Sequence, residues 1–161
     1  MSAVTRIFIN EKIRVRFTPA EVWAVLSDVE AYPRWWPASL PVSVERIGAS
    51  LQGSEIRVRP RFARPFSFRF EECEEPEAFR IRFLDGVLDG PGYFFLERTE
   101  EGTRVRAEID IVARGYLSAI LARVLPVSRF HARHLRKVLR SFNRRLKARR
   151  PRDSEMLPAT S

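Results

Sequence analysis

The clearest pattern of apolar and polar positions lies near the C-terminus, over residues 116–147. At roughly 100° per residue, the apolar side chains and both histidines fall on one half of a helix, and the charged side chains fall on the other. The pattern predicts a helix that is kinked or broken at Pro126, with a long arm from Val127 that buries one face. The apolar half consists of Val127, Phe130, His131, His134, Leu135, Val138, Leu139, Phe142 and Leu146.

Segments that alternate apolar and polar residues precede this helix and predict an antiparallel sheet. The first strand is predicted at residues 5–17, and later strands at 40–44, 56–61, 66–70, 79–83, 93–97 and 105–111. Residues 84–92 are interpreted as a loop or a bulged hairpin. Glu11 occupies an apolar position of the first strand. We interpret it as a sign of a bulge or a strand end, with an inward-pointing carboxylate as the alternative.

Two short helices are predicted between the first and second strands. Thr18, followed by Pro19 and Glu21, forms the pattern of a capped helix start. Ser27 and Glu30 repeat the capping spacing, which predicts a second short helix that ends before Pro33. Two tryptophans follow, at positions 35 and 36. We expect at least one of Trp35 and Trp36 to face a cavity or pack against the long helix; the alternative is that both are ordinary core residues.

The order of elements predicts an α+β fold, in which a curved antiparallel sheet wraps around the C-terminal helix. We expect one domain over residues 1–150 and a disordered tail over 151–161. No apolar run approaches the roughly 20 residues of a membrane span, and the N-terminus lacks a signal-peptide pattern. The single cysteine, Cys73, lies among carboxylates and is expected to be inert. These features favour a cytoplasmic protein.

Several motifs together resemble the START-like (SRPBCC) helix-grip superfamily, and in particular its polyketide cyclase/dehydrase and lipid-transport branch. They are "VWAVLSDVEAYPRWWP" after the first strand, "DGPGYFFLE" and "EGTRV" before the last strand, and the final helix with its two histidines. The resemblance implies a seven-stranded sheet that grips the last helix around a cavity for an apolar ligand. The expected ligand-binding residues are Trp35, Trp36, Phe95, Phe130, His131, His134 and Val138.

The histidines are the only candidates for chemistry in this cavity. His131 and His134 lie one helical turn apart, but no further metal ligand lies near them in the helix, so we expect no metal and no cofactor. Each is either a satisfied core residue or a polar group inside the cavity. Asp85 and Asp89 are explained by turn chemistry. No catalytic signature of a known type occurs.

Three functions follow from these observations. The first is the binding of a hydrophobic small molecule, such as a lipid, an isoprenoid or an aromatic polyketide, with affinity from apolar walls. The second is a cyclase or dehydratase that uses the cavity histidines as general acid or base. The third is a binder of an anionic membrane surface or nucleic acid; the absence of aromatic residues from the helix's polar face disfavours nucleic acid.

The third function rests on the distribution of charge. The net charge is +9, and residues 111–152 contain 13 Lys or Arg and no Asp or Glu. The predicted basic stripe of the helix consists of Arg129, Arg133, Arg136, Arg140, Arg144 and Lys147. Three interpretations remain open: a docking surface for anionic lipid, a partner of the acidic segment "EECEEPE" of the same or a neighbouring subunit, or a solvated helix face.

Overall fold

The computed structural model describes residues 4–61, 64–84, 88–114 and 127–149, with the side chains of these residues except 4, 5, 127–132 and 149. Seven strands form one sheet in the order β1-β7-β6-β5-β4-β3-β2, and every neighbouring pair is antiparallel. The strands are β1 (Val4–Val15), β2 (Val42–Arg46), β3 (Glu55–Val58), β4 (Phe66–Glu74), β5 (Ala78–Phe83), β6 (Leu88–Thr99) and β7 (Gly102–Arg114).

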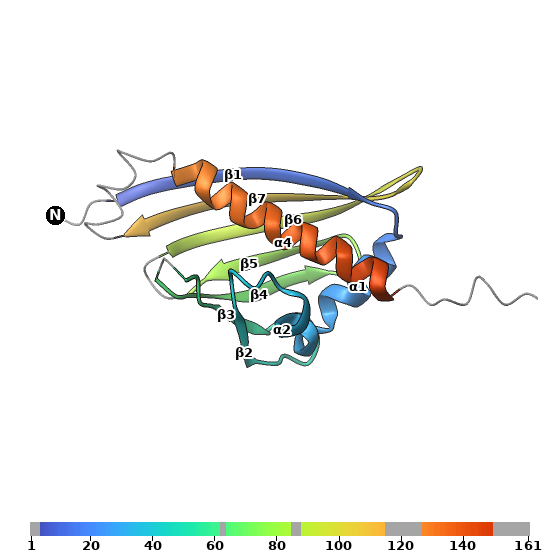
Figure 1. Ribbon diagram of the computed structural model, residues 1–161, viewed down its shortest axis with the longest axis horizontal. Helices are drawn as coiled ribbons and strands as arrows, with labels where there is room; N and C mark the ends of the chain where they lie inside the picture. Colours follow the sequence, from blue (N-terminus) through green and yellow to red (C-terminus); the bar gives the residue numbers. More distant parts are fainter. Residues whose placement is uncertain (1–3, 62–63, 85–87, 115–126, 150–161) are drawn as a thin grey trace, which may run out of the picture.

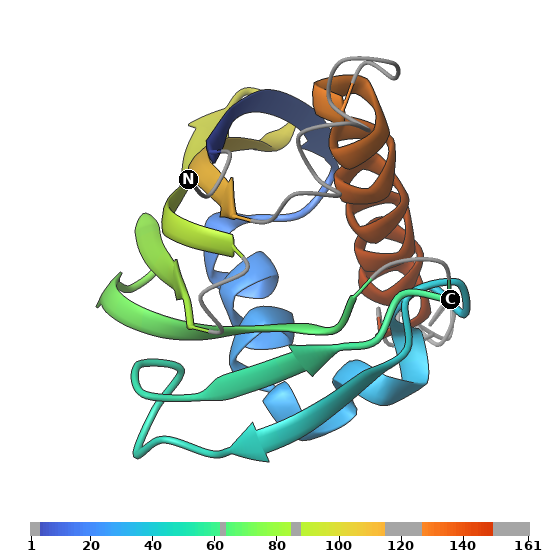
Figure 2. The same ribbon diagram turned by 90° about the vertical axis from the view of Figure 1, so that its left-hand side faces the viewer.

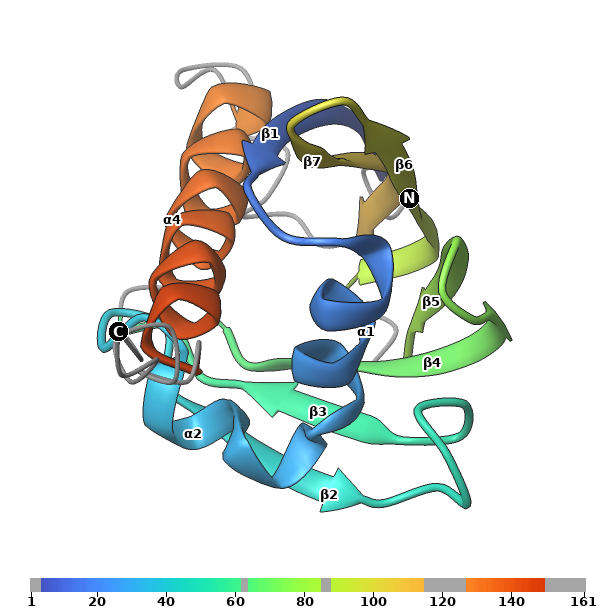
Figure 3. The same ribbon diagram turned by 90° about the vertical axis from the view of Figure 1, so that its right-hand side faces the viewer.

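The helices cover the inner face of this curved sheet. They are α1 (Pro19–Ser27), the 3-10 turn η1 (Val29–Ala31), α2 (Tyr32–Trp35) and α4 (Val127–Arg149). The helix α4 crosses in front of the sheet (Figure 1) and contacts the edge strand β1 as well as α1 and α2. Views along the other directions show the sheet curving away from α4 while α1 and α2 close one end (Figures 2 and 3). The prediction of a helix-grip fold with seven strands is confirmed.

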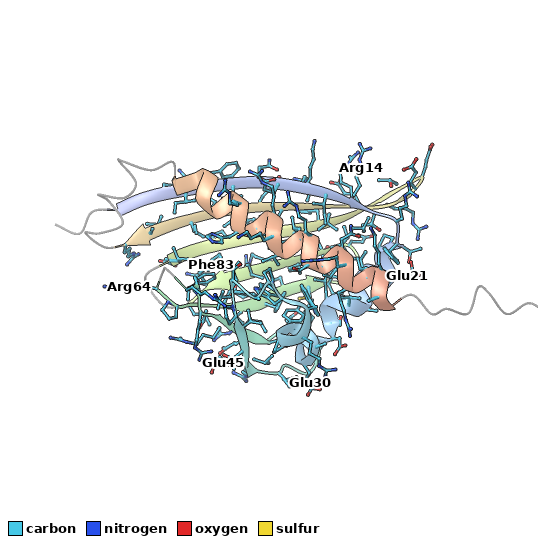
Figure 4. The ribbon with its side chains drawn as sticks, viewed as in Figure 1. Arg14, Glu21, Glu30, Glu45, Arg64 and Phe83 are labelled. Carbon is cyan, nitrogen blue, oxygen red and sulfur yellow. The ribbon has the colours of Figure 1, made fainter. Side chains whose placement is uncertain are left out.

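Strict alternation places the apolar core between the sheet and the helices. Along β7, every second residue from Thr103 to Ala113 is buried, and the same holds for Ile7 and Ile9 on β1. Phe83 on β5 is buried, whereas the labelled charged side chains lie toward the periphery of the molecule (Figure 4). The buried hydroxyl of Tyr32 donates to the carbonyl oxygen of Leu26 at 2.6 Å, which satisfies the polar atom of a side chain at the centre of the core.

The helix starts follow the sequence closely, with one exception. The side chain of Thr18 accepts from the backbone N–H of Glu21, and the Glu21 carboxylate accepts from the N–H of Thr18, so the predicted capping box is present. The predicted end of the second helix before Pro33 is wrong, because Pro33 lies inside α2. Proline is tolerated in a first helical turn, where its missing N–H has no intrahelical partner to lose.

Two strand predictions also need correction. The segment at 84–92 is only partly a loop, because β6 begins at Leu88 and pairs with both β5 and β7. The bulge or strand end proposed at Glu11 is wrong, since β1 pairs with β7 without a register shift from Val4 to Val15. The Glu11 carboxylate instead stays on the helix side of the strand, where it meets Arg136 of α4 at 3.4 Å.

Candidate functional site

Burial along α4 changes from one half of the helix to the other. The C-terminal half has buried apolar side chains with an exposed fraction of 5% or less, at Leu139, Phe142 and Leu146. Leu135 and Val138 pack against the same core but remain half-buried, as does His134. Leu135 lies in line with the buried residues on a helix of about 3.6 residues per turn, so it also faces the sheet. The inward face of α4 is therefore less completely buried at Leu135 and Val138 than at Leu139, Phe142 and Leu146.

The two adjacent tryptophans lie where α2 meets the buried half of α4. The Trp35 ring lies 5.6 Å from the Phe142 ring of α4 and 5.3 Å from the Trp36 ring, centroid to centroid. The Trp36 ring stacks on Tyr32 at 5.6 Å. This arrangement agrees with the expectation that at least one tryptophan packs against the long helix.

The indole nitrogens of this cluster are buried donors without acceptors. Nε1 of Trp35 and Nε1 of Trp36 are shielded from solvent, and neither has a hydrogen-bond partner in the part of the chain that the structure describes. Buried tryptophan N–H groups usually find an acceptor, because leaving one unpaired costs about 1–3 kcal/mol. Two such donors side by side in an aromatic cluster are chemically suited to an acceptor oxygen.

Phe95 does not belong to this site. On β6 it lies opposite Arg106 of β7, and the Arg106 guanidinium carbon lies 4.3 Å above the centre of its ring. Buried Val105 and Ala107 flank Arg106 and face the core, so Phe95 and Arg106 share the outer face of the sheet. The expectation that Phe95 lines the cavity is wrong. Its neighbour Phe94 faces inward instead, stacked on Phe79 at 4.6 Å.

The remaining expected residues divide into two groups. The side chains of Phe130 and His131 lie outside the described residues. His134 and Val138 lie on α4 as described above. Among the residues that the structure describes, no group of three His, Cys, Asp or Glu side chains is close enough together to hold a metal ion.

Phenylalanines dominate the inner face of the sheet beneath α4. Phe68 lies 5.6 Å from Phe70, and Phe70 lies 5.4 Å from Phe79, with rings inclined to each other. Phe66 and Phe83 form another pair at 5.8 Å, of which Phe66 is only half-buried. These rings form a continuous aromatic layer on the inner face of β4 and β5.

A separate hollow of about 520 Å³ lies away from α4, which the sequence patterns did not indicate. Three segments surround it: the end of α1 with η1, the loop between β2 and β3, and the end of β4. Its lining includes Trp23, Asp28, Val29, Leu51, Cys73 and Glu75. No sequence pattern points to this hollow, because its walls come from segments that are far apart in the chain.

The surroundings of the thiol in this hollow disfavour its thiolate form. Burial raises the pKa of Cys73 to about 11, so the protonated form predominates at neutral pH. The sequence predicted an inert cysteine on the grounds of neighbouring carboxylates. The outcome agrees, but desolvation is the cause.

This shift gives a direct test by alkylation. The rate of Cys73 modification by iodoacetamide is expected to rise about tenfold per pH unit from pH 7 to pH 10, because the thiolate fraction grows throughout this range. A free thiol in a short peptide is the control, and its rate should level off near pH 9. A plateau at the same pH in the folded protein would contradict the raised pKa.

Basic side chains on the two sides of the molecule have different surroundings. On the outer face of the sheet, arginines lie within 4 Å of carboxylates; they are Arg6, Arg59, Arg69, Arg80, Arg82, Arg104, Arg106 and Arg114. In the described part of α4, by contrast, a single arginine forms an ion pair, Arg136 with Glu11. Two residues of the acidic segment named as an alternative partner, Glu71 and Glu72, pair with Arg80 of β5 rather than with α4.

A family model described as "Polyketide cyclase / dehydrase and lipid transport" matches residues 6–150. The chain belongs to this family. A search of curated protein sequences finds no match. No helix in the described part of the chain is long and apolar enough to cross a membrane.

Several solved structures are similar to this family member. The Zhui aromatase/cyclase from Streptomyces sp. R1128 has a TM-score of 0.67 at 16% identity, covering 92% of this chain and 98% of its own. The di-domain ARO/CYC StfQ from the steffimycin biosynthetic pathway has a TM-score of 0.64 at 16% identity, covering 89% of this chain and 50% of its own. Norcoclaurine synthase from Thalictrum flavum, in complex with dopamine and hydroxybenzaldehyde, has a TM-score of 0.64 at 8% identity, covering 93% of this chain and 90% of its own. These likenesses show the fold.

Proposed function

We propose that this protein binds a hydrophobic small molecule between the inner face of the sheet and α4. The observation that carries the proposal is the half-buried state of Leu135 and Val138, which pack against the core on a helix whose next inward apolar residues, Leu139, Phe142 and Leu146, are buried. Half-buried apolar side chains beside an aromatic wall gain stability when an apolar ligand covers them, by about 25 cal/mol for each Å² removed from water. Membership of a family described by cyclase, dehydrase and lipid-transport activities supports the same function.

The polar groups of the proposed site favour a ligand that carries an oxygen. The unpartnered indole N–H groups of Trp35 and Trp36 can donate to a carbonyl or hydroxyl oxygen. His134 provides a further polar group two turns before Phe142, and the helical pattern adds Phe130 and His131 to the same side of α4. A lipid, an isoprenoid with a polar head, or an aromatic polyketide has the required combination of apolar body and oxygen acceptors.

A binding assay with the neutral dye Nile red tests the site. The dye is expected to bind with one-to-one stoichiometry, and His134→Trp should weaken its binding about tenfold, because a bulky indole would fill space between α4 and the sheet. Lys137→Trp is the matched control, since it adds the same side chain to the exposed face of the same helix. Equal dye affinity in both variants would remove α4 from the site.

Two further measurements identify the ligand and its orientation. Native mass spectrometry of protein purified from its own host is expected to show a defined mass increment for a tightly held ligand.

Trp36→Phe keeps an aromatic ring but removes one hydrogen-bond donor, and it should weaken binding of that ligand about fivefold to tenfold. An unchanged affinity would show that the indole N–H does not orient the ligand.

The alternative function is a cyclase or dehydratase reaction in the same place. The family description and the half-buried position of His134 support it, because histidine exchanges protons near neutral pH. His134→Gln distinguishes the two functions once the ligand is known. Retained binding with loss of turnover favours the enzyme, whereas retained binding with no turnover in the parent protein favours the carrier.

A further inference from the structure

We infer that the outward face of α4 is a docking surface for an anionic lipid bilayer. The surface consists of five exposed residues and is called the basic face below. They are Arg133, Lys137, Arg140, Arg144 and Lys147. These positions fall within about 80° of arc around the helix axis, and they extend over roughly 21 Å at 1.5 Å per residue. They form one straight, narrow band of positive charge.

The contrast with the sheet shows why this band attracts an outside partner. Eight arginines on the sheet side of the molecule have carboxylates within 4 Å, as described above, so much of the positive charge there is compensated within the molecule. The nearest carboxylate contact of the described part of α4 is made by Arg136 at the edge of the band, with Glu11. The sequence from 111 to 152 contains no Asp or Glu, so no carboxylate of α4 itself can compensate the basic face.

The shape and composition of the basic face favour a bilayer over a nucleic acid. It is the outward side of a single helix, and among its exposed residues there is no aromatic side chain on which a base could stack. A helix lying along a membrane surface brings all its outward basic residues near the lipid phosphates at once. The buried part of the inward face, with Phe142 and Leu146, holds the helix in place without a contribution from the membrane.

Docking would also bring the proposed ligand site close to the bilayer, because α4 covers that site. This consequence rests on the proposed function, whereas docking itself does not. Arg136 connects the docking surface with the ligand site. It lies between the basic face and the inward side, and it holds the edge strand β1 through Glu11. A lipid phosphate competes with Glu11 for the same guanidinium, so docking weakens a contact between α4 and the sheet.

The test is co-sedimentation with vesicles of phosphatidylcholine, alone or mixed equally with phosphatidylglycerol, without any added ligand. The parent protein is expected to bind only the mixed vesicles. Binding should fall steeply as salt rises, because the Debye length shortens from about 8 Å at physiological salt to about 3 Å at 1 M. Failure of ligand binding in the Nile red assay leaves this result unaffected, so the two proposals fail separately.

Charge reversal locates the surface. The triple variant Arg133→Glu/Lys137→Glu/Arg140→Glu is expected to bind mixed vesicles at least about 100-fold more weakly, since each basic residue near an anionic surface contributes about fivefold. A matched control places the same charge change on the sheet, as the triple variant Arg14→Glu/Arg46→Glu/Arg98→Glu at three exposed positions. It should retain binding within about threefold. Circular dichroism melts of both variants check that they remain folded.

A gain-of-function variant gives a second readout. Glu11→Gln removes the carboxylate that faces Arg136, and it is expected to strengthen binding to mixed vesicles by about threefold to fivefold. Three results overturn the inference: binding to phosphatidylcholine alone, equal losses in the two triple variants, or binding to duplex DNA with the same affinity and salt dependence as the mixed vesicles. Absence of vesicle binding overturns it as well.

Discussion

A chain that ends at residue 126 is expected to lose cooperative folding altogether. Without α4 the inner face of the sheet loses its longest helix, and the contacts of Leu139, Phe142 and Leu146 are lost together. Full burial of such side chains contributes about 1.5–3 kcal/mol each, so their sum is comparable with the whole free energy of unfolding of a typical domain. The measurement is a thermal melt followed by near-ultraviolet circular dichroism, in which no sigmoidal transition should appear.

The matched control is a chain that ends at residue 150, just after α4. Its midpoint of unfolding is expected to equal that of the full chain, because the residues removed, 151–161, include only two large apolar side chains, Met156 and Leu157. A monomeric, cooperatively melting protein that ends at residue 126 would overturn the view that α4 completes the core.

Gly102→Ala is expected to destabilise the protein by about 3 kcal/mol or more, which lowers the midpoint of unfolding by roughly 10 °C in a domain of this size. Gly102 begins β7 with a φ of +148°. A β-carbon there would lie 2.2 Å from the carbonyl oxygen of Val15 and 2.9 Å from the backbone nitrogen of Phe17. These are backbone atoms that cannot move aside, and Thr103 fixes them further by donating to the Phe17 carbonyl at 2.6 Å.

Gly53→Asn separates backbone strain from this clash. Gly53 also has a positive φ, of +88°, but a β-carbon there would have no contact closer than 3.8 Å. Asparagine tolerates this region of φ, so a loss of about 1 kcal/mol or less is expected. Equal losses of unfolding free energy in the two variants, measured by urea denaturation, would show that crowding by Val15 and Phe17 has no role.

Local patterns in the sequence were sufficient to predict much of the fold. Alternation predicted the strands, and the capping box at Thr18 and Glu21 fixed the start of α1. Where the local pattern is compatible with either face of a strand pointing inward, only the pairing with a distant strand determines which face is buried. Tyr93, Phe94, Phe95 and Leu96 are all apolar, so the inward phase of β6 could not be read from them; the register with β7 turns Phe95 outward over Arg106.

The candidate site was less predictable for the same reason. The periodicity of β1 places Glu11 at an inward position, but it gives no sign of the partner that stabilises the carboxylate there. That partner is Arg136, which lies near the other end of the chain. The hollow beside Cys73 likewise needs three segments brought together by the fold. In contrast, the sequence did predict that at least one of the two adjacent tryptophans faces a cavity or packs against the long helix, and Trp35 packs against Phe142 of α4.

The placement of the three tryptophans gives this protein its own optical reporters. Trp35 and Trp36 lie 5.3 Å apart beside the proposed ligand site, close enough for their excited states to interact, while Trp23 lines the separate hollow. A ligand that contacts the pair changes their shared emission and circular dichroism, whereas an event at the hollow changes the emission of Trp23 alone. Replacing Trp23 by phenylalanine therefore leaves a molecule whose tryptophan fluorescence, excited at wavelengths that tyrosine does not absorb, comes only from the pair beside α4.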